Sequence, residues 1–253
     1  MAGAIYPDLK GKTALITGGG SGIGEALVKS FARQGSQVGF IDIAAEASAK
    51  VVDAVRTDGG TAHYERADLR DIGQLRAAIG KIRDALGPIT ILLNNAAHDE
   101  RHKTEEVTPD YFDERIAVNL KHQFFAAQAV LPDMKAAGGG SIICFGSNSW
   151  MLGIGGMAVY TASKSAVHGL ARSLARDFGP FNIRVNVLVP GWIMTERQLK
   201  LWVTPEADKA REEGQCLKRR LYPDDVARVA LFLSSDEASA ITNQSYVVDG
   251  GWL

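Results

Sequence analysis

Short apolar runs alternate with segments of helical period along the whole chain. The apolar runs lie at 13–17, 37–42, 89–94, 141–145, 183–189 and 246–249, with a weaker one at 61–68. Several are apolar on both faces, as strands are in a parallel sheet that helices cover on each side. The segments between them have helical period at about 22–34, 45–57, 71–86, 108–137, 159–179 and 223–235. This alternation predicts an α/β fold with a doubly wound parallel sheet.

One segment breaks this rhythm. Residues 191–220 follow a strand but are rich in charge, with Trp192, Trp202 and Pro205 among them. An insertion at the carboxyl end of a strand is where such a fold places a substrate lid, and the alternative is a surface helical hairpin without chemistry. The sequence has no linker or repeat, so we expect one domain over 1–253 with a lid around 191–215.

The charge balance limits the partners. Lys and Arg number 28 against 29 Asp and Glu, so the formal net charge is −1. Nucleic acids and anionic membranes select a basic face, and no apolar run approaches the roughly 18 residues of a membrane span, so we expect neither partner. Cys144 and Cys216 provide no disulfide framework and no metal-ligand spacing. We therefore expect no metal and a reducing, cytoplasmic location.

A glycine-rich loop, TGGGSGIG at 17–24, follows the first strand and opens a helix. Gly18 permits a sharp turn of the backbone. Gly22 falls at the helix N-terminus, where backbone N–H groups and the positive helix end face a pyrophosphate. Gly24 permits close packing of the helix on the strand. The strand before the loop and the helix after it make a dinucleotide site the preferred interpretation.

Two acidic residues follow the next strands. Asp42 ends the second strand, where a carboxylate accepts hydrogen bonds from an adenosine ribose and repels a 2′-phosphate. It therefore favours NAD over NADP as the cofactor; the alternative is a solvated turn residue. Asp68 ends the third strand and is placed either to meet the adenine amino group or to cap the next helix.

Tyr160 and Lys164 lie four residues apart on a predicted helix and share one face. A phenol is a poor base at neutral pH, and a nearby ammonium lowers its pKa, which yields a general acid/base for an alcohol and ketone pair. Ser147 follows a strand, where its hydroxyl can bond the same substrate oxygen. Asparagine is unfavourable in the middle of a helix, so Asn119 suggests a specific role. Either it holds a water that relays protons, or it is a buried amide whose hydrogen bonds are satisfied within the protein.

In this order the motifs resemble the short-chain dehydrogenase/reductase family over nearly the whole chain. The matching pieces are TGGGSGIG at 17–24, Asp42, Asp68, NNAA at 94–97, Asn119, Ser147, YTASK at 160–164, PGWIMT at 190–195 and VDGGW at 248–252. The resemblance implies a Rossmann-type fold with about seven parallel strands, helices on both faces and usually a tetramer. The apolar end of the chain, Val247–Leu253, fits such an assembly. Ala97 stands where the family usually has glycine. Because a methyl group is small, we expect a slight local adjustment of the structure and no loss of cofactor binding.

The resemblance also implies roles for residues. Tyr160 is the acid/base, Ser147 polarises the substrate oxygen, Lys164 also holds the nicotinamide ribose, and Asn119 positions a relay water. Asn95 and Ala96 line the adenosine side, Ile193 meets the carboxamide, and Thr195 lies near the carboxamide and phosphates. The expected cofactor-binding residues are Gly18, Ser21, Gly22, Ile23, Gly24, Asp42, Asp68, Leu69, Asn95, Ala96, Tyr160, Lys164, Pro190, Gly191, Ile193 and Thr195.

The expected substrate pocket mixes hydrogen-bonding groups with flat aromatic rings, which suits a polyhydroxylated ring. Its candidate residues are His98, Asp99, Asn148, Trp150, Trp192 and Gln198, with Arg101 and Trp202 nearby. A narrower resemblance, to bacterial D-xylose 1-dehydrogenases of this family, is carried by AIYPDLKGK at 4–12, DERHK at 99–103, FGSNSW at 145–150 and QCLKRR at 215–220. It implies oxidation of an aldose, a pentose or deoxyhexose, at C1 to the aldonolactone, and related sugar dehydrogenases that act on L-arabinose, L-fucose or D-galactose stay open.

Other activities stay open from the sequence. A 2-keto-3-deoxy acid dehydrogenase needs a cation for the substrate carboxylate, which Arg101 or Arg197 can supply. An acyl-carrier-protein ketoreductase is disfavoured by Asp42, because such reductases usually prefer NADPH. A nucleotide-sensing protein that kept the fold and lost the chemistry is disfavoured by the intact catalytic set.

Overall fold

A computed structural model describes residues 3–253; residues 1 and 2, with which the predicted domain begins, lie outside the described residues. The strands are β1 (Thr13–Thr17), β2 (Gln37–Asp42), β3 (Thr61–Arg66), β4 (Ile89–Asn94), β5 (Gly140–Phe145), β6 (Ile183–Pro190) and β7 (Ser245–Val248). The helices are α1 (Gly22–Arg33), α2 (Ala45–Thr57), α3 (Ile72–Leu86), α4 (Pro109–Ile116), α5 (His122–Ala136), α6 (Ala158–Phe178), α7 (Glu196–Leu201), α8 (Pro205–Gly214) and α9 (Pro223–Ser234).

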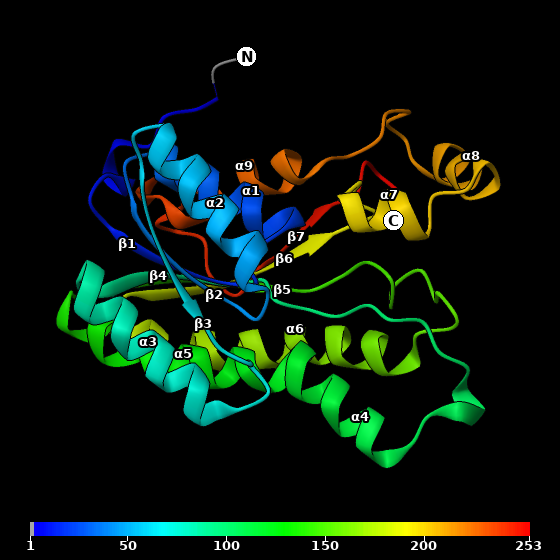
Figure 1. The fold of residues 1–253 in the computed structure, drawn as a ribbon, viewed down its shortest axis with the longest axis horizontal. Coiled ribbons are helices and arrows are strands. Elements are labelled where there is room, and N and C mark those ends of the chain that lie inside the picture. Colours follow the sequence, from blue (N-terminus) through cyan, green and yellow to red (C-terminus); the bar gives the residue numbers. More distant parts are fainter. Residues whose placement is uncertain (1–2) are drawn as a thin grey trace.

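The strands form one parallel sheet in the order β3-β2-β1-β4-β5-β6-β7, with helices on both faces, as the alternation of runs predicts. In Figure 1, α1, α2 and α9 lie above the sheet, and α3, α4, α5 and α6 lie below it. All residues of β1 are buried, because helices cover both of its faces. The strand order reverses direction between β1 and β4, which opens a crevice at the carboxyl ends of these strands.

The long helical segment predicted over 108–137 is three pieces. α4 begins at Pro109 after Thr108, whose hydroxyl accepts a hydrogen bond from the Tyr111 N–H. A π-helical segment, η3 (Ala117–Lys121), then separates α4 from α5. The hydrophobic period continues across the widened turn, so the sequence pattern does not reveal it.

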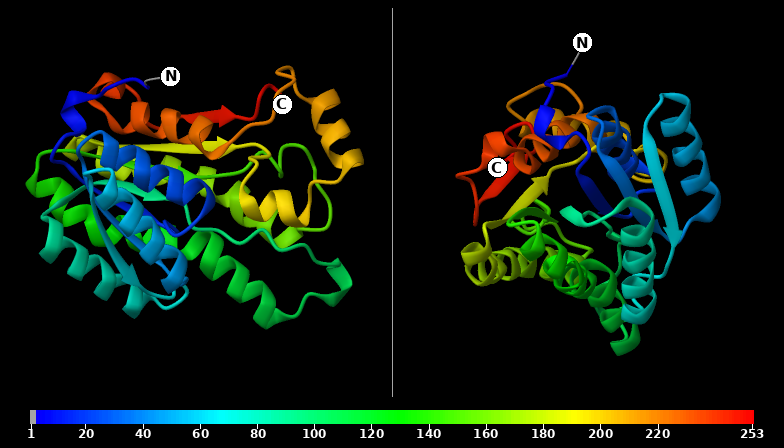
Figure 2. Two further views of the ribbon diagram at one scale, coloured as in Figure 1. Left: turned by 45° about the horizontal axis from the view of Figure 1, so that its top comes forward. Right: turned by 90° about the vertical axis from the view of Figure 1, so that its left-hand side faces the viewer.

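The segment predicted as a lid over 191–215 contains α7 and α8, two short helices with Thr195 and Thr204 as their N-caps. Figure 2 shows both helices, in yellow to orange, beyond the end of the sheet toward which β6 and β7 point, with the C-terminus beside them. None of the helices within 3–253 combines the length and the apolar character that a membrane span requires.

α3 packs closely against the sheet at Gly39 of β2. A Cβ added at Gly39 would lie 2.2 Å from Cγ2 of Ile82, whereas one added at Gly80 of the same helix would meet nothing within 4 Å. We expect Gly39→Ala to lower the free energy of unfolding by about 1–3 kcal/mol through overpacking. The control Gly80→Ala should raise it by about 0.5–1 kcal/mol, because glycine weakens a helix interior.

Urea denaturation of both variants beside the wild type measures these changes. A Gly39→Ala protein as stable as the wild type would contradict the close packing of β2 on α3.

Candidate active site

Loops at the carboxyl ends of β4, β5 and β6 surround a cavity of about 610 Å³. Residues from these loops, from α6 and from the lid segment form its walls, and Ser147, Tyr160 and Lys164 are among them. Ligands of open α/β sheets bind at this edge. The cavity is therefore the candidate active site.

Lys164 is almost fully buried on α6. Its ammonium donates a hydrogen bond of 2.7 Å to the carbonyl oxygen of Phe145, the last residue of β5. Burial lowers the pKa of this ammonium to about 8, while Cys144 and Asp99 raise it. The ammonium nitrogen lies 5.7 Å from the centroid of the Tyr160 ring, so the two side chains share one face of α6 as their spacing predicts.

The environment of Tyr160 differs from the sequence-based expectation. Burial is the largest influence and raises the pKa of the phenol; a hydrogen bond with Ser147 lowers it, and the charge of Asp99 raises it. We expected Lys164 to lower this pKa. In the structure its ammonium is engaged by the Phe145 carbonyl and burial dominates, so the net shift of the phenol pKa is upward.

Ser147 follows β5 and is held by Ser149, which the sequence analysis did not single out. The Ser147 hydroxyl donates to Oγ of Ser149 at 3.0 Å and accepts from the Ser149 N–H at 3.2 Å. Both serines line the cavity. The only sequence signal for Ser149 is its place two residues after a predicted catalytic residue.

Asn119 lies in the middle of the π-helical segment and is fully buried. Its Oδ1 accepts from the His98 N–H at 2.8 Å, and its Nδ2 donates to the His98 carbonyl oxygen at 3.2 Å. Asn119 is not part of the cavity wall. The amide therefore joins the π turn to the loop after β4. This arrangement matches the second of the two interpretations of Asn119, a buried amide whose hydrogen bonds are satisfied.

The glycine loop fits a dinucleotide pyrophosphate. A Cβ at Gly24 would lie 1.7 Å from the Gly18 carbonyl oxygen, and Gly18, at φ +70°, has the conformation that glycine favours. Ser21 precedes α1 but its side chain caps no N–H, so the first amides of the helix face the crevice. Asn95 fixes the loop, because its Nδ2 donates to the carbonyl oxygens of Thr17 and Gly18, each at 3.0 Å.

Asp42 is held at the end of β2 by backbone amides. One carboxylate oxygen accepts from the Gly20 N–H and the other from the Ala44 N–H, both at 2.9 Å. A carboxylate has about four acceptor sites, so each oxygen keeps capacity for a further donor. Its position beside the glycine loop is the one that the sequence predicts.

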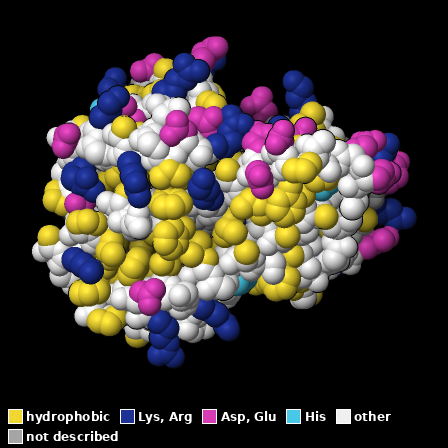
Figure 3. All heavy atoms as spheres, turned by 90° about the horizontal axis from the view of Figure 1, so that it is seen from below, with side chains coloured by type: hydrophobic (Ala, Val, Ile, Leu, Met, Phe, Trp, Pro, Cys, Tyr) yellow, Lys and Arg dark blue, Asp and Glu magenta, His cyan; other side chains and the backbone are white. Residues whose placement is uncertain are grey.

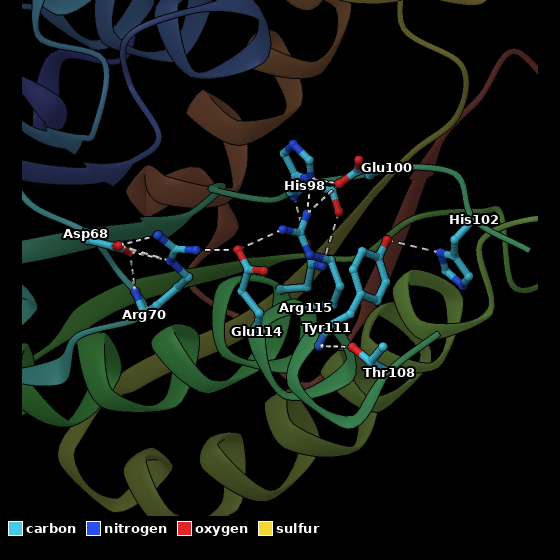
Figure 4. A network of polar contacts seen from close by, with 10 residues as sticks. Asp68, Arg70, His98, Glu100, His102, Thr108, Tyr111, Glu114 and Arg115 are labelled. Carbon is cyan, nitrogen blue, oxygen red and sulfur yellow. Dashed lines mark hydrogen bonds and ion pairs between the residues drawn. The ribbon is translucent and has the colours of Figure 1, made fainter. Parts of the chain in front are cut away.

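Asp68 is engaged by Arg70, as Figure 4 shows, and does not cap α3. The N-cap of α3 is Asp71, whose carboxylate accepts from two backbone amides, so the capping alternative for Asp68 is wrong. Arg70 continues to Glu114 of α4, which also pairs with Arg115. Hydrogen bonds with Arg70 lower the pKa of the Asp68 carboxyl.

The predicted cofactor residues divide into two groups. Those in the cavity wall are Ile23, Asn95, Tyr160, Lys164, Pro190, Gly191, Ile193 and Thr195. Those outside it lie along the ends of β1 to β4 and are Gly18, Ser21, Gly22, Gly24, Asp42, Asp68, Leu69 and Ala96. Ala97 lines the cavity with an ordinary negative φ, so alanine causes no backbone strain there.

The predicted substrate residues separate in the same way. Asp99, Asn148, Trp192 and Gln198 line the cavity, together with Arg101 and Trp202. His98 and Trp150 do not. The His98 ring contacts Arg115 and Glu100, and the Trp150 ring packs edge-on against His168 at 5.3 Å. The sequence placed both near the site by chain position, but their side chains turn to α4 and α6.

The lid contributes further wall residues and contacts the opposite loop. Trp192 Nε1 donates to Oε1 of Gln198 at 2.9 Å, and Gln198 Nε2 donates to Asp99 at 2.6 Å. The Arg101 guanidinium lies 4.7 Å from the ring centroid of Trp202. Trp252 completes the wall and was missed, because nothing in its local sequence shows that the chain end returns to the lid.

Comparison with known proteins agrees with this geometry. A family model described as enoyl-(acyl carrier protein) reductase matches residues 18–253. The D-xylose 1-dehydrogenase of Caulobacter vibrioides is 47% identical over 252 residues, covering 100% of both chains. The chain belongs to the short-chain dehydrogenase/reductase family. It is therefore an oxidoreductase that acts on CH–OH groups with a nicotinamide cofactor.

Two further relatives of this short-chain dehydrogenase/reductase are informative. A protein of Rhizobium meliloti named "probable galactose dehydrogenase" is 47% identical over 247 residues, covering 97% of this chain and 96% of the relative. A gluconate 5-dehydrogenase of Burkholderia cenocepacia, solved with NADP and tartrate, is 31% identical with a TM-score of 0.90, covering 97% of each chain.

The buried Lys164 of this short-chain dehydrogenase/reductase predicts that the free energy of unfolding depends on pH. The ordinary lysine pKa is 10.5, whereas that of Lys164 in the folded protein is about 8. The unfolded chain therefore binds more protons above pH 8, and stability rises with pH up to about 10. Relative to Lys164→Met, the wild type should gain about 2 kcal/mol of unfolding free energy over this range.

Urea titrations of both proteins across this range measure the gain. Tyr160 is present in both, and its raised pKa lowers stability only above a pH of about 10. A stability difference that stays constant with pH would show that the buried ammonium keeps an ordinary pKa.

Proposed function

We propose that the protein is an NAD-dependent sugar dehydrogenase that oxidises C1 of a neutral aldose, a pentose or deoxyhexose such as D-xylose, to the aldonolactone. The observation that carries this is a cavity in which Tyr160, Ser147 and Lys164 meet carboxylate, amide and indole groups. Hydroxyl groups find donors and acceptors there, and indole faces cover ring C–H groups. The full-length similarity to a D-xylose 1-dehydrogenase supports the same substrate class.

A bound nicotinamide supplies the hydride acceptor. Tyr160 acts as the phenolate, after its phenol has released its proton to solvent, and takes the proton of the C1 hydroxyl as the C1–H hydride leaves and the carbonyl of the lactone forms. Ser147 donates to the same oxygen and orients it. Lys164 holds a ribose of the cofactor and offers a positive charge near the phenol, and Asn119 keeps the loop after β4 in place.

Asp42 supports the choice of NAD. Its carboxylate is fixed beside the glycine loop by the amides of Gly20 and Ala44. The remaining acceptor sites suit the two hydroxyls of an adenosine ribose, and the negative charge opposes a 2′-phosphate. Asp68, with its carboxylate on Arg70, offers a further acceptor to the adenine amino group.

We propose that residues 191–215 form a lid of the single domain. α7 and α8 bring Gln198, Trp202 and two alanines into the cavity wall. The hydrogen bond between Gln198 and Asp99 closes the lid on the opposite loop. α7 meets that loop through side chains alone and opens at lower cost than α8, which the largely buried Arg211 anchors through Asp208 and Gln215.

We also propose a homotetramer in a reducing, cytoplasmic compartment. Phe112 of α4 and Phe124 of α5 are exposed, and Figure 3 shows apolar side chains gathered on the face where these helices lie. Val247 on the edge strand β7 and Leu253 are exposed as well. Cys144 and Cys216 are both free thiols, which fits a reducing location.

The proposal is tested by formation of reduced nicotinamide from NAD with D-xylose, L-arabinose, L-fucose, D-galactose and D-glucose. Turnover of a pentose or deoxyhexose to the lactone is expected, and Tyr160→Phe should lower kcat by about 10²–10⁴. NAD binding, followed by fluorescence, should persist in that variant. Activity on 2-keto-3-deoxy acids without activity on any aldose would replace the aldose with a sugar acid.

The cofactor preference is tested separately. Asp42→Ala should strengthen NADP binding relative to NAD by about 10-fold or more, because it removes a charge that repels the 2′-phosphate. Titration of both nucleotides with the wild type and the variant gives the ratio without turnover. An unchanged ratio would mean that Asp42 does not read the ribose.

A further inference from the structure

Asp99 places a carboxylate in the cavity wall, on the loop after β4. Its side chain is 26% exposed, so it is neither sealed off nor on the open surface. Among residues 3–253, no other Asp or Glu lines the cavity. A charge in this position selects among ligands by their own charge.

The contacts of Asp99 fix its direction but leave acceptor capacity. Trp192 donates to the oxygen of the Gln198 amide, so the Gln198 nitrogen must face Asp99, to which it donates at 2.6 Å. Arg197 approaches the other carboxylate oxygen at 3.5 Å from its Nε. One close hydrogen bond and one longer ion pair occupy only part of the four or so acceptor sites of a carboxylate.

The loop around Asp99 is held on both sides. His98 is bonded through its backbone N–H and carbonyl to the Asn119 amide. Arg115, largely buried, contacts the His98 ring and lies 3.5 Å from Glu100 (Figure 4). Asp99 sits between these two anchored residues, so its carboxylate is preorganised for a ligand.

Asp99 also acts at the reacting end of the cavity. Its charge raises the pKa of both Tyr160 and Lys164. Arg101, the alternative site for a substrate carboxylate, is held against the Trp202 ring of the lid segment.

We propose that Asp99 selects neutral polyhydroxylated substrates: it accepts hydrogen bonds from sugar hydroxyls next to the reacting carbon and repels substrates that carry a carboxylate. This rests on the proposed function and narrows it to neutral sugars. Gln198 and Trp192 act through Asp99 as positioning residues, since they orient its carboxylate from the lid.

The test compares D-galactose with D-galacturonate, which share a ring and differ in one carboxylate. The variant is Asp99→Asn, and the matched control is Glu196→Gln, which removes a charge from an exposed residue of α7. The ratio of kcat/KM for the neutral sugar to that for the acid should fall by about 10-fold or more in Asp99→Asn. It should stay unchanged in Glu196→Gln.

Where galactose turnover is slow, the inhibition constants of the two sugars against D-xylose give the same ratio. A second readout is the pH limb of kcat/KM that reports Tyr160. The groups that act on this phenol are Ser147, from the loop after β5, and Asp99, with Lys164 on α6 facing its ring. The limb should move to lower pH in Asp99→Asn, which a general loss of structure would not produce.

An unchanged ratio in Asp99→Asn, or a wild type that prefers D-galacturonate, would overturn the role of Asp99 while leaving the aldose activity intact. A wild type that oxidises no aldose and binds none would instead refute the proposed function. The two failures are therefore distinguishable in one set of measurements.

Discussion

Seven strands that run in one direction bring all their carboxyl ends to the same edge of the sheet, and the site depends on that arrangement. β1 delivers the glycine loop, β2 ends at Asp42, and β5 ends at Phe145, whose carbonyl binds the ammonium of Lys164. Helices bury both faces of these strands, so the ladder is rigid at its centre. The loops at its edge can then hold polar side chains in fixed relation without a hydrophobic core of their own.

The cavity combines opposite electrostatic demands in a small volume. Burial favours the neutral forms of both Tyr160 and Lys164, which suits a site that passes a proton between a hydroxyl group and the protein. Asp99 opposes burial at Lys164 and adds to it at Tyr160. A single carboxylate thus raises the pKa of both groups, against the effect of burial at the ammonium and in the same direction as burial at the phenol.

Local patterns predicted much of this molecule. The strands and main helices follow from apolar runs and helical period, and the glycine loop, Asp42 and the Tyr160–Lys164 pair follow from spacing. What the sequence could not give depends on contacts between distant segments. The turn of His98 toward Arg115 of α4 and the place of Trp252 in the cavity wall are examples, since these side chains meet their partners only after folding. The π turn over Ala117–Lys121 leaves no periodic signal.

That π turn fixes the length of its helix. Loss of one residue within Ala117–Lys121 would close this widened turn into regular α-helical winding, because a π turn holds one residue more than an α turn. The Asn119 amide would then lose the position from which it bonds the His98 backbone. The segment between β6 and α9 is held in place differently: the largely buried Arg211 of α8 bonds Asp208 and Gln215, and Gln215 donates to the Asp249 carbonyl oxygen. Substrate range can therefore change most readily through substitutions at positions that face the cavity, while the backbone of both segments keeps its length.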